Sequence, residues 1–430
     1  LVWELNQLFQ VHYYFHYHFL FIFIKKSMLN PDKVRNQFPS LSIKNNKGDK
    51  IIFLDGPGGT QVPRAVIDSI SDYYKFSNAN THGEFETSNK TDIIMDSLRE
   101  KMSIFLGAEN KDCISIGHNM TTLNFSLARG LIKYFNEGDE VVITDLDHEA
   151  NRGPWMILKE KGIKIIRINI LKNGEIDYND FIKKINKKTV MIAMGMSSNA
   201  IGTVNNFQFI KEIIENKNIL FLLDAVHYAP HFSINVTDLD CDFLLCSSYK
   251  FYGPHLGFLY SRPGLLDKIE TERLTVQDQN SPYKIETGTL NHAACSGAEK
   301  ALDFISSLGN GNSYREKIED AYKVIGEHEN KLAKKLYSSL NKLENIDVVG
   351  PDFSDKRSPT VSFIHKNLSA NNICKLLAKE NICAWDGHFY AKKAIDKMGL
   401  REIGGVTRLG ISCYNSIDEI DRTISVLSKI

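Results

Sequence analysis

The sequence has 430 residues, of which 43% are hydrophobic and 24% charged, and its 52 basic residues balance 52 acidic ones. This length allows two or three hydrophobic cores, and the composition is typical of a globular protein instead of a disordered or fibrous one. Zero net charge excludes a strong electrostatic footprint for nucleic acid or an anionic membrane surface. The seven cysteines form no Cys-x-x-Cys pair. This argues against a disulfide framework and a structural zinc site, and favours a reducing, cytoplasmic compartment.

Residues 1–24 are rich in aromatic side chains, but three histidines interrupt them. The longest apolar run, residues 19–24, is far shorter than the roughly 18 residues that span a bilayer. Two lysines follow this run and no Ala-x-Ala-like site is present, so a secretory signal peptide fits poorly. Met28 is a suitable domain start. We therefore expect residues 1–27 to come from an over-extended gene model, with a membrane-surface anchor as the alternative.

From residue 28 onward, short β-branched runs alternate with longer amphipathic segments. Strands are predicted at residues 140–144, 163–168, 190–194, 219–223 and 243–246. Each is too apolar to leave one face in water, which indicates buried parallel strands. Helices are predicted between them at residues 122–135, 154–161, 178–185 and 209–215. This alternation predicts a doubly wound, mostly parallel α/β sheet with right-handed connections.

The pattern changes after about residue 296. A long charged helix is predicted at residues 314–343, followed by strands at 346–349 and 360–364 and helices at 371–380 and 416–429. These elements predict a smaller C-terminal α+β domain at residues 301–430. We expect residues 56–300 to form the large domain and residues 28–55 to pack with the small one.

Two segments of the large domain contain candidate anion and ring contacts. Thr121 and Thr122 stand at the start of a predicted helix, where free N–H groups and the helix dipole favour a phosphate, although threonine is also an ordinary N-cap. His148 follows the strand that ends at residue 144, so its ring could lie flat on a bound aromatic ring. A metal site at His148 is the competing interpretation, but no second ligand stands at a familiar spacing.

Two further candidates follow neighbouring predicted strands. Asp224 and His227 come after the strand at 219–223, and Lys250 after the strand at 243–246. The carboxyl ends of parallel strands share one sheet edge, where α/β folds bind ligands. A partly desolvated lysine there can form a Schiff base, and a carboxylate can hold a protonated pyridine ring. Taken singly, the lysine could be a surface residue, the aspartate a helix N-cap and the histidine the polar end of a loop.

Together with other segments, these residues resemble the class V aminotransferase family of pyridoxal phosphate enzymes. Within it, the chain is most similar to the cysteine desulfurase-like branch, which is related to group II cysteine desulfurases and selenocysteine lyases. The resemblance runs from about residue 28 to residue 430. Its motifs, in order, are FLDGPGGTQVP at 53–63, NTHG at 80–83, NMTT at 119–122, DHEAN at 147–151, SNAIGTVN at 198–205, DAVH at 224–227, SSYK at 247–250, ETGT at 286–289 and TR at 407–408.

The resemblance implies a pyridoxal 5'-phosphate site on a fold type I scaffold. By it, Lys250 carries the cofactor as an internal aldimine, Asp224 pairs with the pyridine nitrogen, and His148 stacks on the ring. The residues that it assigns to the remaining cofactor contacts are Thr121, Thr122 and Ser247 for the phosphate, Asn199 and His227 for the phenolic oxygen, and Thr289 for the phosphate held by the partner subunit of a homodimer.

The substrate side of the site follows from the same resemblance. Arg408, just before a strand predicted at residues 409–413, is expected to bind the α-carboxylate of an amino-acid substrate, since its planar fork suits a bidentate contact. A structural ion pair is the alternative role for Arg408. His82 and Tyr390 are expected to contact substrate, with Phe85 and Trp385 as further candidates for specificity.

One departure from the family decides the expected reaction. Group II desulfurases carry their nucleophilic cysteine in a loop of the form R-x-G-H-H-C-A, whereas residues 384–391 here read AWDGHFYA. Tyr390 therefore stands at the cysteine position, and Cys383 lies seven residues earlier, on a different turn. Tyr249 also replaces a histidine that relatives keep before the lysine. A phenol cannot carry a persulfide, so we expect conventional desulfuration to fail.

The prediction is thus a pyridoxal phosphate-dependent transferase or lyase, with transamination, β-elimination, racemisation or a selenocysteine-lyase-like reaction left open. One alternative is a true desulfurase or selenocysteine lyase that uses another thiol. Another is a non-catalytic cofactor-binding scaffold. A nucleotide-dependent oxidoreductase fits less well, because no G-x-G-x-x-G follows the first strand. No metal, nucleic-acid or membrane partner is expected.

Overall fold

The computed structural model describes residues 29–430. The interpretation of residues 1–27 falls outside this part of the chain. Within it, no helix is both long enough and apolar enough to cross a membrane.

The central element is a seven-stranded sheet with the order β2-β8-β7-β6-β5-β3-β4. The five strands from β7 to β4 run parallel, while β8 and β2 are antiparallel to their neighbours. The strand bounds are β2 Ile114–Gly117, β3 Glu140–Thr144, β4 Lys164–Ile168, β5 Thr189–Gly195, β6 Leu220–Asp224, β7 Phe243–Ser247 and β8 Gly257–Ser261. The predicted doubly wound layer is therefore present, and the five predicted strands are all found within one or two residues of their expected bounds.

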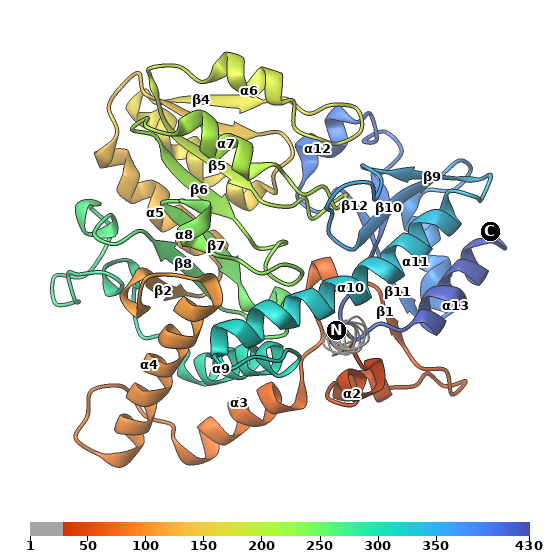
Figure 1. Ribbon diagram of the computed structural model, residues 1–430, viewed down its shortest axis with the longest axis horizontal. Helices are drawn as coiled ribbons and strands as arrows, with labels where there is room; N and C mark the ends of the chain where they lie inside the picture. The colour runs from red at the N-terminus through yellow and green to blue at the C-terminus, as the bar shows by residue number, and fades with distance from the viewer. Residues whose placement is uncertain (1–28) are drawn as a thin grey trace, which may run out of the picture.

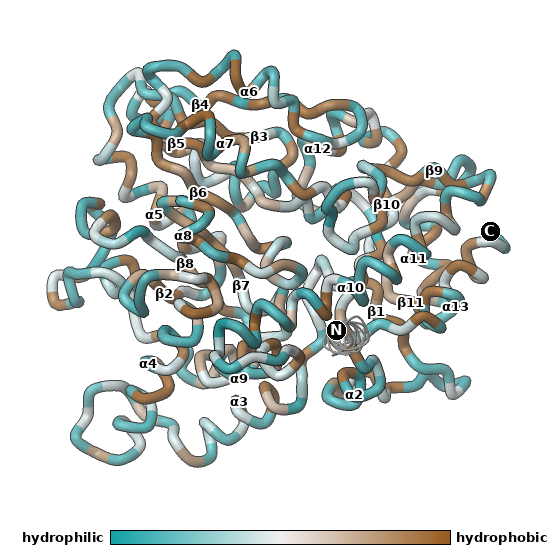
Figure 2. Tube along the Cα trace, in the orientation of Figure 1, coloured by the Kyte–Doolittle hydropathy of each residue, from teal (hydrophilic) through white to brown (hydrophobic). Residues whose placement is uncertain are grey.

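Alternate residues of the strands enter two different hydrophobic cores. Val142 and Ile192 pack into the core on one face of the sheet, whereas Val141 and Met191 pack into the core on the other face. Burial on both faces explains why these strands read as continuous apolar runs. Figure 2 shows the same feature, since the tube is brown along β5 and β6.

Helices cover both faces of this sheet (Figure 1). The helices up to residue 307 are α2 Pro31–Arg35, α3 Arg64–Phe76, α4 Glu86–Leu106, α5 Met120–Tyr134, α6 Tyr178–Lys184, α7 Phe207–Ile214, α8 Val236–Leu239 and α9 His292–Ser307. Those after it are α10 Tyr314–Leu340, α11 Ala370–Lys379, α12 Lys392–Lys397 and α13 Ile417–Leu427. Helices α3, α4 and α9 were not predicted from the sequence.

A smaller antiparallel sheet follows in the C-terminal part, with the order β12-β13-β10-β9. Its strands are β9 Ile346–Val349, β10 Thr360–His365, β12 Trp385–Gly387 and β13 Val406–Gly410. It shares a third hydrophobic core with the end of α10 and with α11 and α13. The N-terminal strand β1 (Ile52–Phe53) pairs in parallel with β11 (Ile382–Cys383). The domain boundaries at residues 55 and 300 remain a prediction.

Three expectations from the sequence need correction. Strand β4 is not buried on both faces, because it is the sheet edge and its Lys164 and Arg167 are exposed. The helical segment Pro154–Lys161 is a 3-10 helix. Arg408 lies inside strand β13, which ends at Gly410, instead of preceding a strand at 409–413. Pairing with β10 and β12 fixes this strand, whereas the apolar pattern alone placed it too late.

A buried ion pair holds the beginning of the loop before α9 against the sheet. The Arg99 guanidinium donates to both oxygens of Glu286 at 2.7 Å, and Glu286 also accepts from the Ile116 amide at 2.6 Å. Arg99 further donates to the Ile114 carbonyl at 2.6 Å. Each charge is thus satisfied inside the protein, so removal of either one would leave the other buried and unpaired.

We predict that Glu286→Leu lowers the free energy of unfolding by about 3–5 kcal/mol, because it leaves the Arg99 charge uncompensated. The exposed pair Lys111–Asp96, at 2.9 Å, provides the control, and Asp96→Asn should cost less than about 1 kcal/mol. Urea denaturation of the three proteins measures both effects. Equal losses for the two variants would contradict the structural role of the buried pair.

Candidate active site

A pocket lies at the carboxyl ends of the parallel strands, the edge at which open α/β sheets bind ligands. Turns that follow β3, β5, β6 and β7 form its walls, together with the start of α5 and the turn around Pro57. The lining residues include Pro57, Met120, Thr121, Asp147, His148, Ser197, Ser198, Asn199, Asn205, Asp224, His227, Tyr249 and Lys250. Six residues predicted from separate parts of the sequence therefore share one pocket: Thr121, His148, Asn199, Asp224, His227 and Lys250.

Lys250 and Asp224 lie on the turns after adjacent strands. Asp224 ends β6, which pairs in parallel with β7, and Lys250 ends the short 3-10 turn that follows β7. The Lys250 Nζ donates to the Pro57 carbonyl at 2.5 Å and lies 4.7 Å from the centre of the Tyr249 ring. One oxygen of Asp224 accepts from the Val226 amide at 2.9 Å. The next helix, α8, begins only at Val236, so Asp224 is not the helix N-cap that was the structural alternative.

Burial brings the pKa values of Lys250 and Asp224 close together. It lowers the pKa of Lys250 to about 7, an effect that the positive charge of Arg408 strengthens and Asp224 opposes. Burial also raises the pKa of Asp224 to about 7, and the charge of Asp147 adds to this rise. Above this pH the pocket holds a neutral amine beside a carboxylate. A neutral amine is the nucleophilic form of lysine.

His148 lies beside the pocket with a neutral ring. Its Nδ1 accepts from the Ala150 amide at 3.0 Å, and burial, with the charges of Lys250 and Arg408, lowers its pKa to about 4. The Tyr390 ring is tilted against it at a centroid distance of 5.3 Å. Tyr390 itself is 67% exposed, so the residue at the predicted nucleophile position stands at the solvent side of His148.

His227 and Asn199 connect the pocket to the C-terminal part of the chain. The His227 Nε2 lies 3.1 Å from the Thr360 hydroxyl and 3.3 Å from the Ser358 hydroxyl. Burial holds the pKa of His227 well below its ordinary value. Asn199 donates from its side chain to the Phe389 carbonyl at 2.8 Å. His227 thus contacts the start of β10, while Asn199 holds the loop after β12.

The start of α5 is packed tightly against the sheet. Ser247, the last residue of β7, accepts from the Met120 amide at 3.0 Å. A Cβ atom at Gly257 would lie 2.2 Å from the Asn119 backbone, so only glycine permits this approach. Thr121 lines the pocket, whereas the Thr122 side chain is exposed and donates to the Asn119 carbonyl at 2.9 Å. The helix end is thus aimed at the pocket through Thr121 and the backbone.

Arg408 is buried without a carboxylate pair in the described part of the chain. One of its terminal nitrogens donates to the Asn199 carbonyl at 2.9 Å, and its guanidinium carbon lies 3.9 Å from the centre of the Phe389 ring. Its Nε is buried with no hydrogen-bond partner among residues 29–430. Burial lowers the pKa of Arg408 to about 9. A structural ion pair therefore does not account for this residue.

Other predicted residues do not line the pocket of the single chain. His82 is exposed, with its Nδ1 3.2 Å from Asp92, and Thr289 is exposed on the loop before α9. Phe85 and Trp385 are 57% and 53% exposed. Their roles toward substrate and cofactor remain predictions.

Four polar residues of the pocket have no role predicted from the sequence: Asp147, Ser197, Ser198 and Asn205. Asp147 follows the end of β3, which is the same signal that identified Asp224 after β6. None of the seven cysteines, all within the described residues, lines this pocket. Cys383, on β11, lies in a different depression with Asp55 and Cys374, and burial raises its pKa to about 11.

The chain is similar to known proteins over most of its length. The family model for aminotransferase class-V matches residues 52–423. A probable cysteine desulfurase of Halalkalibacterium halodurans is 30% identical over 417 residues, which cover 93% of this chain and 98% of that protein. An aminotransferase-like protein of Gibberella zeae is 28% identical over 421 residues, which cover 95% of this chain and 100% of that protein.

A solved structure supports the fold. The apo cysteine desulfurase from Thermococcus onnurineus NA1 superposes with a TM-score of 0.82 at 27% sequence identity, and the match covers 94% of this chain and 98% of that one. The α/β fold predicted from the sequence is confirmed.

We predict that Lys250 reacts with an amine reagent far below the pH at which ordinary lysines react. Reductive methylation of the full chain across a pH series, followed by peptide mass spectrometry, gives the midpoint for each lysine. The Lys250 midpoint should lie near 7, against the ordinary 10.5, because its charged form is desolvated. A Lys250 midpoint near 10 would show that the amine is solvated and the pocket open.

Proposed function

The chain belongs to the aminotransferase class-V family as a cysteine desulfurase-like enzyme, and we propose that it uses pyridoxal phosphate to act on an amino acid. The observation that carries this proposal is the juxtaposition of Lys250 and Asp224 in one pocket at the sheet edge. A lysine with a lowered pKa and a nearby carboxylate are the two groups that such a cofactor requires of its protein.

The residues present fit the cofactor. The first turn of α5 offers an anion site through Thr121 and the helix dipole, with Ser247 and Thr122 beside it. Asp224 would pair with the ring nitrogen, and His148 would stack on the face of the ring. Asn199 and His227 would contact the phenolic oxygen. The buried Arg408 Nε without a partner leaves a donor for an incoming carboxylate, because a buried polar atom is costly when unpaired.

We propose that the active form is a homodimer in the cytoplasm. Thr289 is exposed in the single chain, and the family pattern assigns it to the phosphate of the partner subunit. The loop that carries it is anchored by the buried Arg99–Glu286 pair, so its position is fixed before any partner binds.

When bound, pyridoxal phosphate draws electrons away from the α-carbon of an attached amine. The residues of the chain then decide which bond breaks. Lys250 Nζ, neutral above about pH 7, can accept a proton from that carbon and return it. Asp224, ionised above about pH 7, would hold a proton on the ring nitrogen. Both groups reach their working state as the pH rises through the same value.

The substrate is proposed to be an amino acid because Arg408 is available for its carboxylate. The guanidinium is buried and is fixed on one side by Asn199. The Phe389 ring covers its face, which leaves the planar edge for a bidentate contact. Hydrogen bonds from the Asn199 side chain and from the Glu149 amide to backbone carbonyls hold the loop after β12 next to two segments of the pocket wall.

We further propose that the chain does not form a persulfide by the conventional route. Tyr390 stands at the position of the catalytic cysteine, and no described cysteine lines the pocket. Transamination, β-elimination, racemisation and a selenocysteine-lyase-like reaction need no enzyme thiol. The second candidate is desulfuration through another thiol, which the names of the similar desulfurases favour; Cys383 is then the nearest candidate in sequence.

We predict that the full chain with added pyridoxal phosphate shows a visible absorption band that Lys250→Ala abolishes. Titration with a panel of amino acids, cysteine included, should shift the band for one compound, and its products identify the reaction. Lys356→Ala serves as the control, because Lys356 also has a pKa lowered by burial but lies outside this pocket; its band should be unchanged.

Each contrary outcome points to a different alternative. Failure of the wild-type chain to show any band would contradict cofactor binding and with it the proposed function. A band that no amino acid shifts would support the scaffold interpretation. Release of alanine with protein-bound persulfide from cysteine would support the second candidate, and Cys383→Ser would then test which thiol is used.

A further inference from the structure

Asp147 is a buried carboxyl group on the floor of the pocket that the proposed chemistry does not use. It is 4% exposed and lines the same pocket as Asp224. One of its oxygens accepts from the Gly195 amide at 2.8 Å. The other lies 3.4 Å from both the Thr144 amide and the Asn151 side-chain nitrogen. These donors fix the carboxylate in place.

The sheet register brings Asp147 and Asp224 to opposite sides of one residue. Strands β3, β5 and β6 are consecutive in the sheet. Gly195, the last residue of β5, is the register partner of Asp224 and the amide donor to Asp147. A Cβ atom at position 195 would lie 3.0 Å from the Asp147 oxygen. Glycine at this position therefore allows the carboxylate to lie directly against the end of β5.

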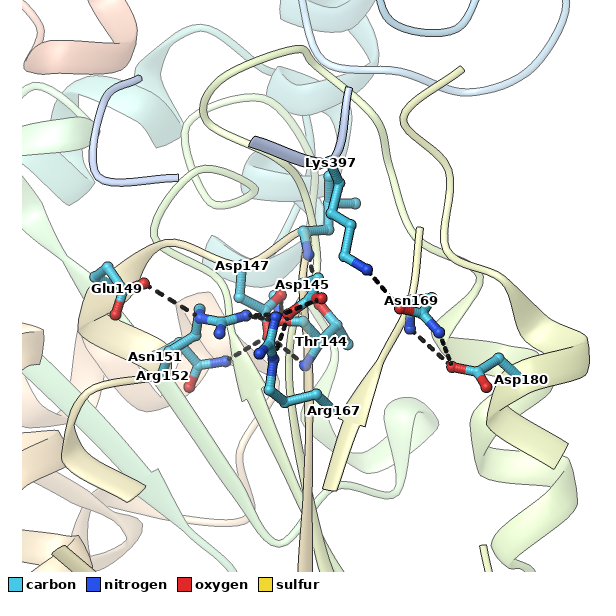
Figure 3. A network of polar contacts seen from close by, with 12 residues as sticks. Thr144, Asp145, Asp147, Glu149, Asn151, Arg152, Arg167, Asn169, Asp180 and Lys397 are labelled. Atoms are coloured by element: carbon cyan, nitrogen blue, oxygen red, sulfur yellow. Dashed lines mark hydrogen bonds and ion pairs between the residues drawn. The ribbon is translucent and has the colours of Figure 1, made fainter. Parts of the chain in front are cut away.

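The neighbouring charges leave Asp147 without an ion-pair partner. Figure 3 shows the network around it, in which Arg152 and Arg167 both bind Asp145, at 2.9 and 2.8 Å. No lysine or arginine of the described chain forms an ion pair with Asp147. Arg152 acts on it only at longer range, while burial raises the pKa of Asp147 to about 6.

The groups that face this pair of acids are few. Lys250, His148 and His227 lie in the same pocket, and both histidines are held neutral by burial. Of these three residues, Lys250 is the one whose positive charge offsets the negative charge of Asp224. When Lys250 is neutral, the two acids face each other with little compensation. A positively charged ring nitrogen would then relieve their repulsion.

We propose that Asp147 is a second acidic positioning residue of this pocket, which acts through Asp224 to keep a proton on the nitrogen of a bound heterocyclic ring. This inference rests on the proposed function, because it requires pyridoxal phosphate in the pocket. In this proposal Asp147 acts through Asp224 and makes no direct contact with the ring nitrogen. Its negative charge would add to that of Asp224, and the two charges together would favour the protonated, positively charged ring nitrogen over the neutral one.

The test compares two ligands on the full chain: pyridoxal phosphate, and its analogue in which a CH group replaces the ring nitrogen. Dissociation constants of both are measured at pH 8 by absorbance. The wild-type chain should prefer the natural compound. Asp147→Asn keeps the shape and an acceptor for Gly195 but removes the charge. It should reduce this preference about threefold to tenfold, which corresponds to roughly half to one pKa unit, and leave binding of the analogue unchanged.

Glu149→Gln provides the matched control. It removes a carboxylate from the same turn as Asp147. The Glu149 side chain is 41% exposed and lies 3.3 Å from Arg152, so this change should leave the preference for pyridoxal phosphate over the analogue unchanged. Gly195→Ala is the second test variant, because it displaces the Asp147 carboxylate without removing its charge. It should reduce the preference in the same direction, and it keeps the question answerable should Asp147→Asn fail to fold.

The outcomes separate this inference from the proposed function. Equal weakening of both ligands by Asp147→Asn would show a structural role and overturn the inference, as would an unchanged preference. The proposed function would stand in both cases. A wild-type chain that binds neither ligand would overturn both.

Discussion

The burial of Lys250 beside Asp224 is the constraint on which the rest of the pocket depends. A lysine can be buried without an ion-pair partner only where the fold offsets the desolvation of its charge or lowers its pKa. Here the pKa falls to about 7, and the Pro57 carbonyl accepts the amine hydrogen bond. The parallel strands β6 and β7 have their carboxyl ends adjacent, and this fixes the two side chains at the same edge.

The surrounding residues follow from that arrangement. Neutral histidines at positions 148 and 227 add polar contacts without adding charge to the pocket. Arg408 is buried, Asp55 acts on it without forming an ion pair, and its unpaired Nε makes it the proposed contact for an anionic substrate. The small C-terminal sheet delivers Arg408 from β13 and the hydroxyl of Thr360 from β10. The proposed substrate and cofactor contacts thus come from different parts of the chain.

Much of this could be predicted from sequence, for identifiable reasons. Strands buried on both faces form continuous apolar runs, so β3, β5, β6 and β7 were found, and the residues just after them marked the pocket. The edge strand β4 and strand β13 were less well described, because hydrogen-bond pairing and sheet position decide their exposure and bounds. Asp147 is part of the DHEAN motif, but no role could be predicted for it. Its proximity to Asp224 depends on the order of the strands in the sheet, which no local sequence pattern reveals. His82 and Thr289 are exposed in the single chain, and their roles depend on contacts beyond it.

The central claim is that Lys250 is the group that holds the cofactor. Its most direct test is to incubate the full chain with pyridoxal phosphate, reduce it with borohydride and map the labelled peptide by mass spectrometry. The added mass is expected on Lys250 alone, in near-stoichiometric amount, at pH 8. Label spread over surface lysines, or absent from Lys250, would contradict it.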